Sequence, residues 1–258
     1  MSPVIDEDLL AQSVELVQAA GELTLEWFRS DRLAVDQKDD GTPVTEADRR
    51  AERFLRQELR GRFPDDGIVG EEEADQPGTS GRRWVIDPID GTKAFTHGVP
   101  LYTNLLALED EAGSALGIIN MPALGETVYA ARGLGCWSNG QRAHVSEHPS
   151  VDGAYLTTSG FGYWDDAALL AVKAAGMLLR TWGDGYGYAL VATGRAETMV
   201  DHAAAHWDLA PMPVIIAEAG GRFTDLEGVV TASGGSGVAT NGPIHTDVLR
   251  LLGSGSSR

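Results

Sequence analysis

The segment Trp84–Thr92, with the sequence Trp-Val-Ile-Asp-Pro-Ile-Asp-Gly-Thr, holds the residue types best suited to chemistry. Its two carboxylates, Asp87 and Asp90, stand three residues apart and would face opposite sides of a regular strand. We expect Pro88 to end the strand after Asp87, so that the chain turns and the two side chains converge. Converging carboxylates repel each other unless a divalent cation neutralises them. The spacing therefore favours a metal site, although a solvated Asp-rich turn is the simpler alternative.

Gly91 and Thr92 extend this segment toward phosphate chemistry. Gly91 places no side chain beside the two acids, and Thr92 is expected to open a helix. The free N–H groups at the start of a helix suit a phosphate group. Carboxylates and phosphate-binding amides would then lie next to each other.

Three further acidic residues, Asp48, Glu71 and Asp208, offer the same ligand chemistry, and each has an ordinary structural explanation. Asp48 can complete a helix cap that begins at Thr45. Glu71 can belong to a solvated acidic run that ends at Asp75, and Asp208 can be a helix N-cap. Their joint order along the chain favours a shared site.

The composition excludes several classes of protein. The 258 residues include 20 Lys and Arg against 38 Asp and Glu, a net charge of −18. Nucleic acids and anionic membranes attract basic surfaces, so neither is expected as a partner. The single cysteine, Cys136, excludes an internal disulfide and a multi-thiolate zinc site. The start of the chain has neither a basic region nor an apolar run, so we expect no signal peptide and a cytoplasmic location.

The elements that must position these residues change in pattern near residue 150. Residues 1–150 are expected to form an α+β half with a mainly antiparallel sheet and most of the acids. Residues 151–258 are expected to form an alternating α/β half that carries Asp208. The expected helices are 6–29, a second from Thr45 to near Gly61, 167–177, 186–193, 208–219 and 245–252. The expected strands are 67–70, 83–87, 102–108, 115–120, 127–131, 154–159, 178–182, 197–200, 222–224 and 238–240, with a hairpin turn at Asn139-Gly140.

The motifs, taken in order, resemble those of the inositol-monophosphatase superfamily of Mg²⁺-dependent, lithium-sensitive phosphatases. They are Thr42-x-x-Thr45-x-x-Asp48, Gly70-Glu71-Glu72, Trp84–Thr92 and Trp207-Asp208. The resemblance covers about residues 9–252. It implies a layered α/β/α/β/α sandwich, an α/β (α+β) fold of the inositol-monophosphatase and fructose-1,6-bisphosphatase type. It also implies a homodimer.

The resemblance assigns metal ligands residue by residue and implies two to three Mg²⁺ ions. Glu71, Asp87 and the carbonyl of Ile89 would hold a first ion. Asp87, Asp90 and Asp208 would hold a second, and Glu71 could hold a weaker third through waters. Oxygen-only ligands suit Mg²⁺, and paired metals can stabilise both the attacking and the leaving oxygen.

Catalytic roles follow from the same resemblance. Thr92, paired with Asp48, would orient and deprotonate the attacking water, and Glu71 is counted as catalytic with them. The amides of Gly91 and Thr92 would hold the phosphate of a small phosphorylated substrate. No covalent phosphoenzyme is required.

The substrate is expected to be read by residues outside the metal core. Residues 42–49, 91–95 and 183–194 resemble the histidinol-phosphate phosphatase branch of the superfamily. Asp184 and Asp201 would form an acidic edge that suits the cationic amine of histidinol phosphate. Asp201 stands where the family usually has Glu, and Arg180 is a further candidate for the pocket lining.

Several alternatives remain open from the sequence. The substrate can instead be inositol 1-phosphate or a range of sugar phosphates, and a non-catalytic metal-binding sandwich is the alternative from another class. Asp184 can be a helix cap. The pair His202-x-x-x-His206 has the spacing of zinc ligands but no intervening Glu, so we expect it to be structural or pocket-lining. Ser159 lacks the sequence of a nucleophile elbow.

Overall fold

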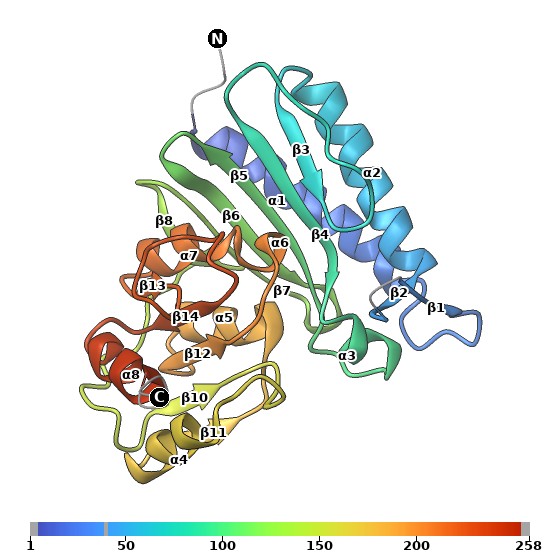
Figure 1. Ribbon diagram of the computed structural model, residues 1–258. Helices are drawn as coiled ribbons and strands as arrows, with labels where there is room; N and C mark the ends of the chain where they lie inside the picture. Colours follow the sequence, from blue (N-terminus) through green and yellow to red (C-terminus); the bar gives the residue numbers. More distant parts are fainter. Residues whose placement is uncertain (1–4, 39–40, 254–258) are drawn as a thin grey trace.

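The computed structural model describes residues 5–38 and 41–253, and two amphipathic helices form its first layer (Figure 1). Helix α1 (Glu7–Leu25) begins at Asp6, whose side chain accepts a hydrogen bond from the amide of Leu9 at 2.9 Å. Helix α2 (Glu46–Arg62) begins at the expected cap, Thr45. Both helices lie on one face of a large sheet, which they cover with their apolar sides.

That sheet has seven strands in the order β3-β4-β5-β6-β7-β8-β9. Only β3 and β4 pair in parallel, so the expected antiparallel character is confirmed. Asn139 and Gly140 have φ values of 46° and 78°, as a tight hairpin turn requires. The strands are β3 (Gly67–Gly70), β4 (Arg83–Asp90), β5 (Thr103–Asp110), β6 (Gly113–Met121), β7 (Glu126–Ala131), β8 (Gly135–Ser138) and β9 (Gln141–Arg142).

A second sheet of five strands follows, in the order β11-β10-β12-β14-β13. Its strands are β10 (Tyr155–Thr157), β11 (Leu178–Arg180), β12 (Thr198–Asp201), β13 (Arg222–Thr224) and β14 (Gly237–Thr240). Helices α5 (Asp184–Ala192) and α7 (Met212–Glu218) contact both sheets and separate them. Helices α4 (Asp166–Ala174) and α8 (His245–Leu252) pack against each other on the outer side. The expected α/β/α/β/α sandwich is therefore confirmed (Figure 1).

Strand β4 differs from the expectation in a way that matters for the site. Pro88 does not end the strand, which continues to Asp90. The register against β5 shifts between Asp87 and Asp90, which marks a β-bulge or irregularity. A bulge changes which way the following side chains point. The two carboxylates therefore converge within the strand and not after it.

The late helix expected over 208–219 is two helices, α6 (His206–Leu209) and α7. Pro211 lies between them and has no N–H with which to continue the helical ladder. Two short strands, β1 (Val35–Gln37) and β2 (Pro43–Thr45), and a 3₁₀ turn, η1 (Pro122–Leu124), were not expected. All three residues of β1 are exposed, so no apolar alternation predicts it. Among the helices in the described part of the chain, none has the length and apolar character that crossing a membrane requires.

Candidate active site

A cleft of about 640 Å³ lies where β4 ends, between the two sheets. Nine of the residues predicted from the sequence line it, from both halves of the chain. They are Glu71, Asp87, Ile89, Asp90, Gly91, Thr92, Asp184, Asp201 and Asp208. Asp48 is buried just behind the lining, and Arg180 does not line the cleft.

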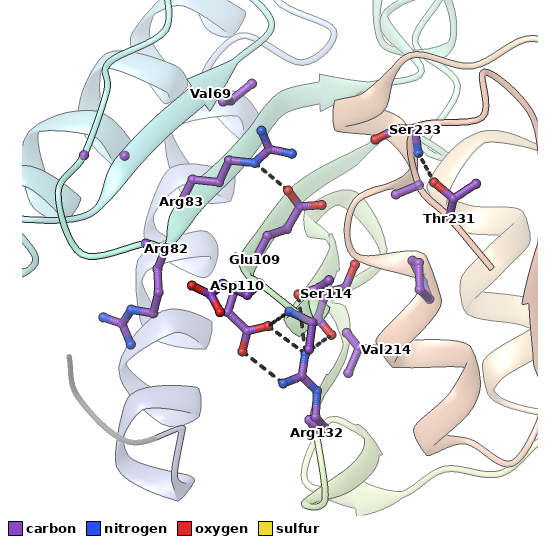
Figure 2. A pocket seen from close by; sticks show the side chains of 18 of the residues that line it. Val69, Arg82, Arg83, Glu109, Asp110, Ser114, Arg132, Val214, Thr231 and Ser233 are labelled. Atoms are coloured by element: carbon purple, nitrogen blue, oxygen red, sulfur yellow. Dashed lines mark hydrogen bonds and ion pairs between the residues drawn. The ribbon is translucent and has the colours of Figure 1, made fainter.

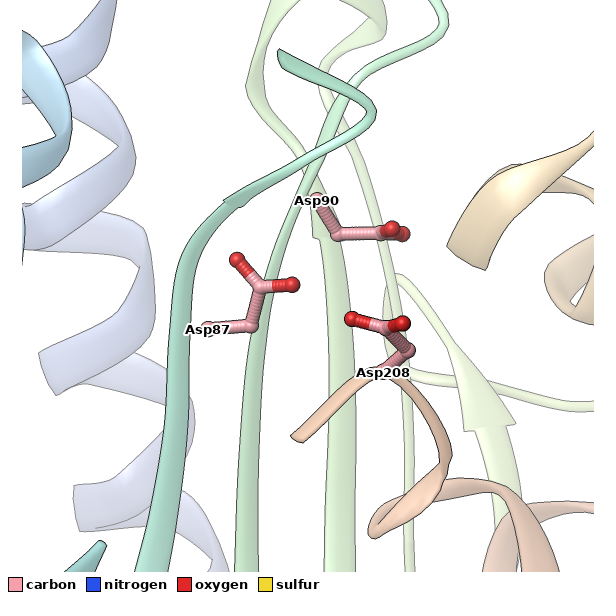
Figure 3. A group of neighbouring side chains, drawn as sticks. All are labelled: Asp87, Asp90 and Asp208. Atoms are coloured by element: carbon pink, nitrogen blue, oxygen red, sulfur yellow. The ribbon is translucent and has the colours of Figure 1, made fainter. Parts of the chain in front are cut away.

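Asp87, Asp90 and Asp208 point toward one another (Figure 3) and each offers an oxygen within 4.8 Å of the others. The first two come from β4 and the third from α6, more than a hundred residues later in the chain. Each carboxylate is held at one oxygen. The donors are the Ile89 amide at 3.0 Å for Asp87, the Thr103 hydroxyl at 2.8 Å and the Gly185 amide for Asp90, and the Ala205 amide at 2.8 Å for Asp208.

The electrostatics of these three acids are unfavourable without a cation. Burial raises the pKa of Asp87 well above its usual range, and the charges of Glu71, Asp90 and Asp208 raise it further. Burial likewise raises the pKa of Asp90, and it raises that of Asp208 to about 6. A site with only oxygen donors and clustered negative charge fits a hard divalent cation such as Mg²⁺.

Glu71 lies next to this cluster because of the strand register. Gly70 pairs with Ile86 across the parallel strands β3 and β4, so the following residues, Glu71 and Asp87, come out side by side. Lys38 contacts the acidic turn with its ammonium group, 2.7 Å from Glu71 and 2.6 Å from Glu72. Glu71 is therefore placed to share a cation with Asp87.

The predicted pair, Thr92 and Asp48, form no hydrogen bond with each other, and each side chain has a different partner. The Thr92 hydroxyl donates to the Ile89 carbonyl at 3.0 Å. One oxygen of Asp48 accepts from the Thr45 amide at 2.8 Å and from the Thr45 hydroxyl at 2.5 Å, so the helix cap is present. The other Asp48 oxygen, Oδ1, is buried without a partner among the described residues. Burial raises the pKa of Asp48 to about 6, so Asp48 combines a structural role with an unused, basic oxygen.

Gly91 forms a turn with a left-handed backbone conformation, which favours glycine. Its φ is 79°, and it is the N-cap of the short helix α3 (Thr92–Thr96). A side chain here would also approach the Asp184 carboxylate, which lies 2.9 Å from the position a Cβ would take. The Gly91 backbone is therefore open to a ligand on one side and closed by Asp184 on another.

The predicted specificity residues meet at Ser159. The Ser159 hydroxyl donates to Asp201 at 2.6 Å and accepts from the Asp184 amide at 2.8 Å. Burial raises the pKa of Asp184, and it raises that of Asp201 to about 7. Asp184 is the first residue of α5, and no side chain caps that helix, so the cap explanation for Asp184 does not hold.

Arg180 is placed differently from the prediction. It is exposed at the end of the edge strand β11, and its guanidinium lies over the rings of Tyr155 and Trp182 at 5.3 and 5.5 Å. With its guanidinium over these rings, Arg180 is not among the residues that line the cleft. The sequence did not show this because the ring partners depend on strand pairing.

Several residues that line the cleft or contact its acids carried little or no local signal. Thr103, Ser159 and Lys38 act through contacts between distant segments, so no spacing in the sequence reveals them. His202 does line the cleft, where its ring lies 4.4 Å from that of Trp164, and burial lowers its pKa. His206 does not line the cleft, and its Nε2 atom lies 3.2 Å from a carboxylate oxygen of Glu109. The two histidines therefore do not form a metal site.

A larger cleft of about 900 Å³ lies at the opposite end of β4 (Figure 2). The arginines that line it are paired with acids: Arg83 with Glu109 at 2.7 Å, Arg132 with Asp110 at 2.9 Å, and Arg82 with Asp66 at 2.8 Å. Neutralised pairs of this kind offer no concentrated charge to a ligand. The smaller cleft is therefore the better candidate for chemistry.

A five-layered sandwich with an oxygen-only carboxylate cluster between its sheets defines a class of metal-dependent phosphatases. The model of the inositol monophosphatase family matches residues 6–254, and the chain belongs to that family. It is 43% identical to the histidinol-phosphatase of Chlorobaculum parvum, covering 95% of this chain and 97% of that relative. It is 38% identical to the histidinol-phosphatase of Mycobacterium tuberculosis, covering 97% and 100%. Its structure is similar to that of a Thermotoga maritima inositol monophosphatase, with a TM-score of 0.87, 33% identity and coverage of 96% and 98%.

Proposed function

We propose that this phosphatase hydrolyses L-histidinol phosphate to L-histidinol and phosphate, in histidine biosynthesis. The observation that carries the proposal is the pair of acids Asp184 and Asp201, which Ser159 links by hydrogen bonds and of which Asp184 lies beside Gly91. Two relatives that share most of their length with this chain are named histidinol-phosphatases, which supports the same substrate.

The substrate's charge distribution matches the cleft. Its phosphate would lie against the Gly91 and Thr92 amides, and its amine would reach the acids at the far side of Gly91. Asp201 is buried and Asp184 is partly buried, so an ion pair there is screened less by solvent than one at the surface. Lys93 also lines the cleft and acts on Asp184, whereas a neutral polyol would add no counter-charge of its own.

The residues that would hold Mg²⁺ are Glu71, Asp87, Asp90, Asp208 and the Ile89 carbonyl. When bound, two or three such ions would lower the pKa of the attacking water and neutralise charge on the leaving oxygen. Asp48 would accept a proton of the water through Oδ1, and Thr92 would help to orient that water. As the oxygen of the water bonds to phosphorus, the phosphorus–oxygen bond to histidinol breaks, and the proton that Asp48 accepted is returned through solvent to the leaving oxygen, so that the products are histidinol and phosphate.

Inositol 1-phosphate is the second candidate substrate, with broader sugar-phosphate hydrolysis as a variant of it. The structural similarity to the Thermotoga maritima inositol monophosphatase favours it, because the metal core would serve either ester equally. We also propose that the protein is a cytoplasmic homodimer and that lithium inhibits it, as in the family it resembles.

The test is the ratio of kcat/KM for histidinol phosphate to that for inositol 1-phosphate, with Mg²⁺ present. We expect a high ratio in the wild type and a fall of at least tenfold in Asp184→Asn and Asp201→Asn. Asp110→Asn, which removes an acid of the larger cleft, should leave the ratio unchanged. A ratio below one in the wild type would assign the protein to the second candidate.

A further inference from the structure

A buried ion pair lies directly behind Glu71. Glu52 and Arg56, one turn apart on α2, have side chains that are 0% and 1% exposed, and their Nε–Oε1 distance is 2.7 Å. Burying such a pair costs desolvation, and apolar residues of similar size often stabilise a core equally well. Its presence therefore calls for an explanation beyond packing.

Both side chains of the pair form hydrogen bonds with the backbone of the acidic turn, residues 71–75. Glu52 accepts from the amides of Glu72 and Glu73 at 2.8 and 3.0 Å. Arg56 donates to the carbonyls of Glu73 and Ala74 at 2.8 and 3.2 Å. Four hydrogen bonds thus hold the three residues that follow Glu71.

The residue before Glu71 is held by the same two side chains. A Cβ at Gly70 would collide with the Glu52 carboxylate, so the backbone of β3 passes directly against the pair. Glu71 is therefore fixed from both sides, by contact at Gly70 and by hydrogen bonds at residues 72–74. Lys38 offsets the charge of this turn by pairing with Glu71 and Glu72, whereas Glu52 and Arg56 hold its backbone.

We infer that Glu52 and Arg56 are positioning residues for the metal site. They hold the Glu71 carboxylate beside Asp87, and they act on the metal only through Glu71. This inference rests on the proposed role of Glu71 as a ligand. Groups that orient a ligand typically change metal affinity 10–100-fold when they are removed.

The experiment is calorimetric titration of the metal-free protein with Mg²⁺, alongside thermal unfolding in chelator. We expect Glu52→Gln to raise the Mg²⁺ dissociation constant by roughly 10–100-fold while the protein stays folded. Arg56→Lys, which keeps the charge but cannot donate to both carbonyls, should give a smaller rise in the same direction. The double variant Glu52→Gln/Glu71→Gln should bind Mg²⁺ no more weakly than Glu71→Gln alone, because the two act as a unit.

Asp66→Asn is the matched control. It breaks another buried pair, Asp66–Arg82 at 2.8 Å, whose acid also accepts from the Trp84 indole at 3.1 Å. It should lower the melting temperature and leave Mg²⁺ affinity unchanged. If Glu52→Gln and Arg56→Lys behave like this control, or if the double variant loses the sum of both effects, the inference is overturned. If Glu71→Gln itself leaves Mg²⁺ affinity unchanged, the proposed ligand set fails instead.

Discussion

At the scale of single residues, the clustered acids of the cleft destabilise the folded chain when no metal is bound. Asp87, Asp90 and Asp208 are held by donors at one oxygen each, yet their pKa values are all raised. A raised carboxyl pKa means that the folded state disfavours the charged form. Selection for binding a cation, and not for stability, explains such a cluster.

Asp87→Asn should therefore separate function from stability. We expect turnover to fall by roughly 10³-fold or more, because the variant loses a ligand whose metal contributes several kcal/mol to the transition state. The melting temperature in chelator should rise, since one repelling charge is gone. Steady-state kinetics at saturating Mg²⁺ and calorimetric scans in chelator measure the two effects. Full turnover, or a lower melting temperature in chelator, would contradict this account.

Asp201 gives a pH-dependent prediction. Its pKa of about 7 means that it is largely protonated below that pH and charged above it. Binding of a cationic substrate should thus strengthen as the pH rises from about 6 to about 8, by up to roughly tenfold. The effect of Asp201 on the stability of the protein has the opposite sign. Its pKa is higher in the folded state than in the unfolded state, so the free energy of unfolding falls as the pH rises from about 4 toward 7.

The measurement is KM for histidinol phosphate relative to KM for inositol 1-phosphate across this pH range. The ratio cancels the titration of the phosphate, which both substrates share, and the contribution of Asp201 is the difference between the wild-type and Asp201→Asn profiles, because the substrate's imidazole titrates equally in both. Asp201→Asn should flatten the profile. A profile that keeps its slope in Asp201→Asn would assign the pH dependence to another group.

At the scale of elements, the end of β4 positions most of the site. The irregularity between Asp87 and Asp90 brings both acids to the same side, and Gly91 then turns the chain into α3. Strand, irregularity, turn and helix together span only residues 83–96, so the metal and phosphate sites are fixed relative to each other. A change in this segment should affect both.

Gly91→Ala tests this coupling. The residue has φ of 79°, which costs a side chain about 1–2 kcal/mol, and the new Cβ would meet the Asp184 carboxylate. We expect turnover to fall more than 10-fold, with a loss of stability close to that strain energy. Gly113→Ala is the control, since Gly113 also has positive φ but nothing within 4 Å of a Cβ. Equal activity losses in the two variants would show that backbone strain alone is responsible.

At the scale of the whole molecule, the cleft joins two sheets. Asp87 and Asp90 belong to the seven-stranded sheet, whereas Asp201 belongs to the five-stranded one and Asp208 to the short helix α6. A cation held by Asp87, Asp90 and Asp208 would link segments that are distant in the chain. Metal binding should thus stabilise the entire fold.

We expect Mg²⁺ at 100 times its dissociation constant to add about 2.7 kcal/mol of stability. For a chain of this size that corresponds to a rise in melting temperature of roughly 5–10 °C. Scanning calorimetry with Mg²⁺, with chelator and with NaCl of equal ionic strength measures it. A melting temperature that responds equally to Mg²⁺ and NaCl would show that the acids bind no specific cation.

The sequence by itself determined most of the elements and the acids. Helix periodicity, the Thr45 cap and the Asn139-Gly140 turn are local signals, and the elements they predict are present. The order of Asp48, Glu71, the 84–92 segment and Asp208 was enough to indicate the family that the match over residues 6–254 shows. Such features depend on neighbours a few residues away, so the sequence contains them directly.

Only the tertiary structure decided which side chains meet. The continuation of β4 through Pro88, the bridge from Ser159 to Asp201, the direction of Arg180 and the Glu52–Arg56 pair behind Glu71 all depend on contacts between segments. Asp48 illustrates the limit, because the sequence offered a cap and a catalytic base as alternatives and the structure has the cap with one oxygen left over. Spacing along a chain specifies local geometry, whereas burial and partners follow from packing between distant elements, and packing sets the pKa values and orientations on which the chemistry depends.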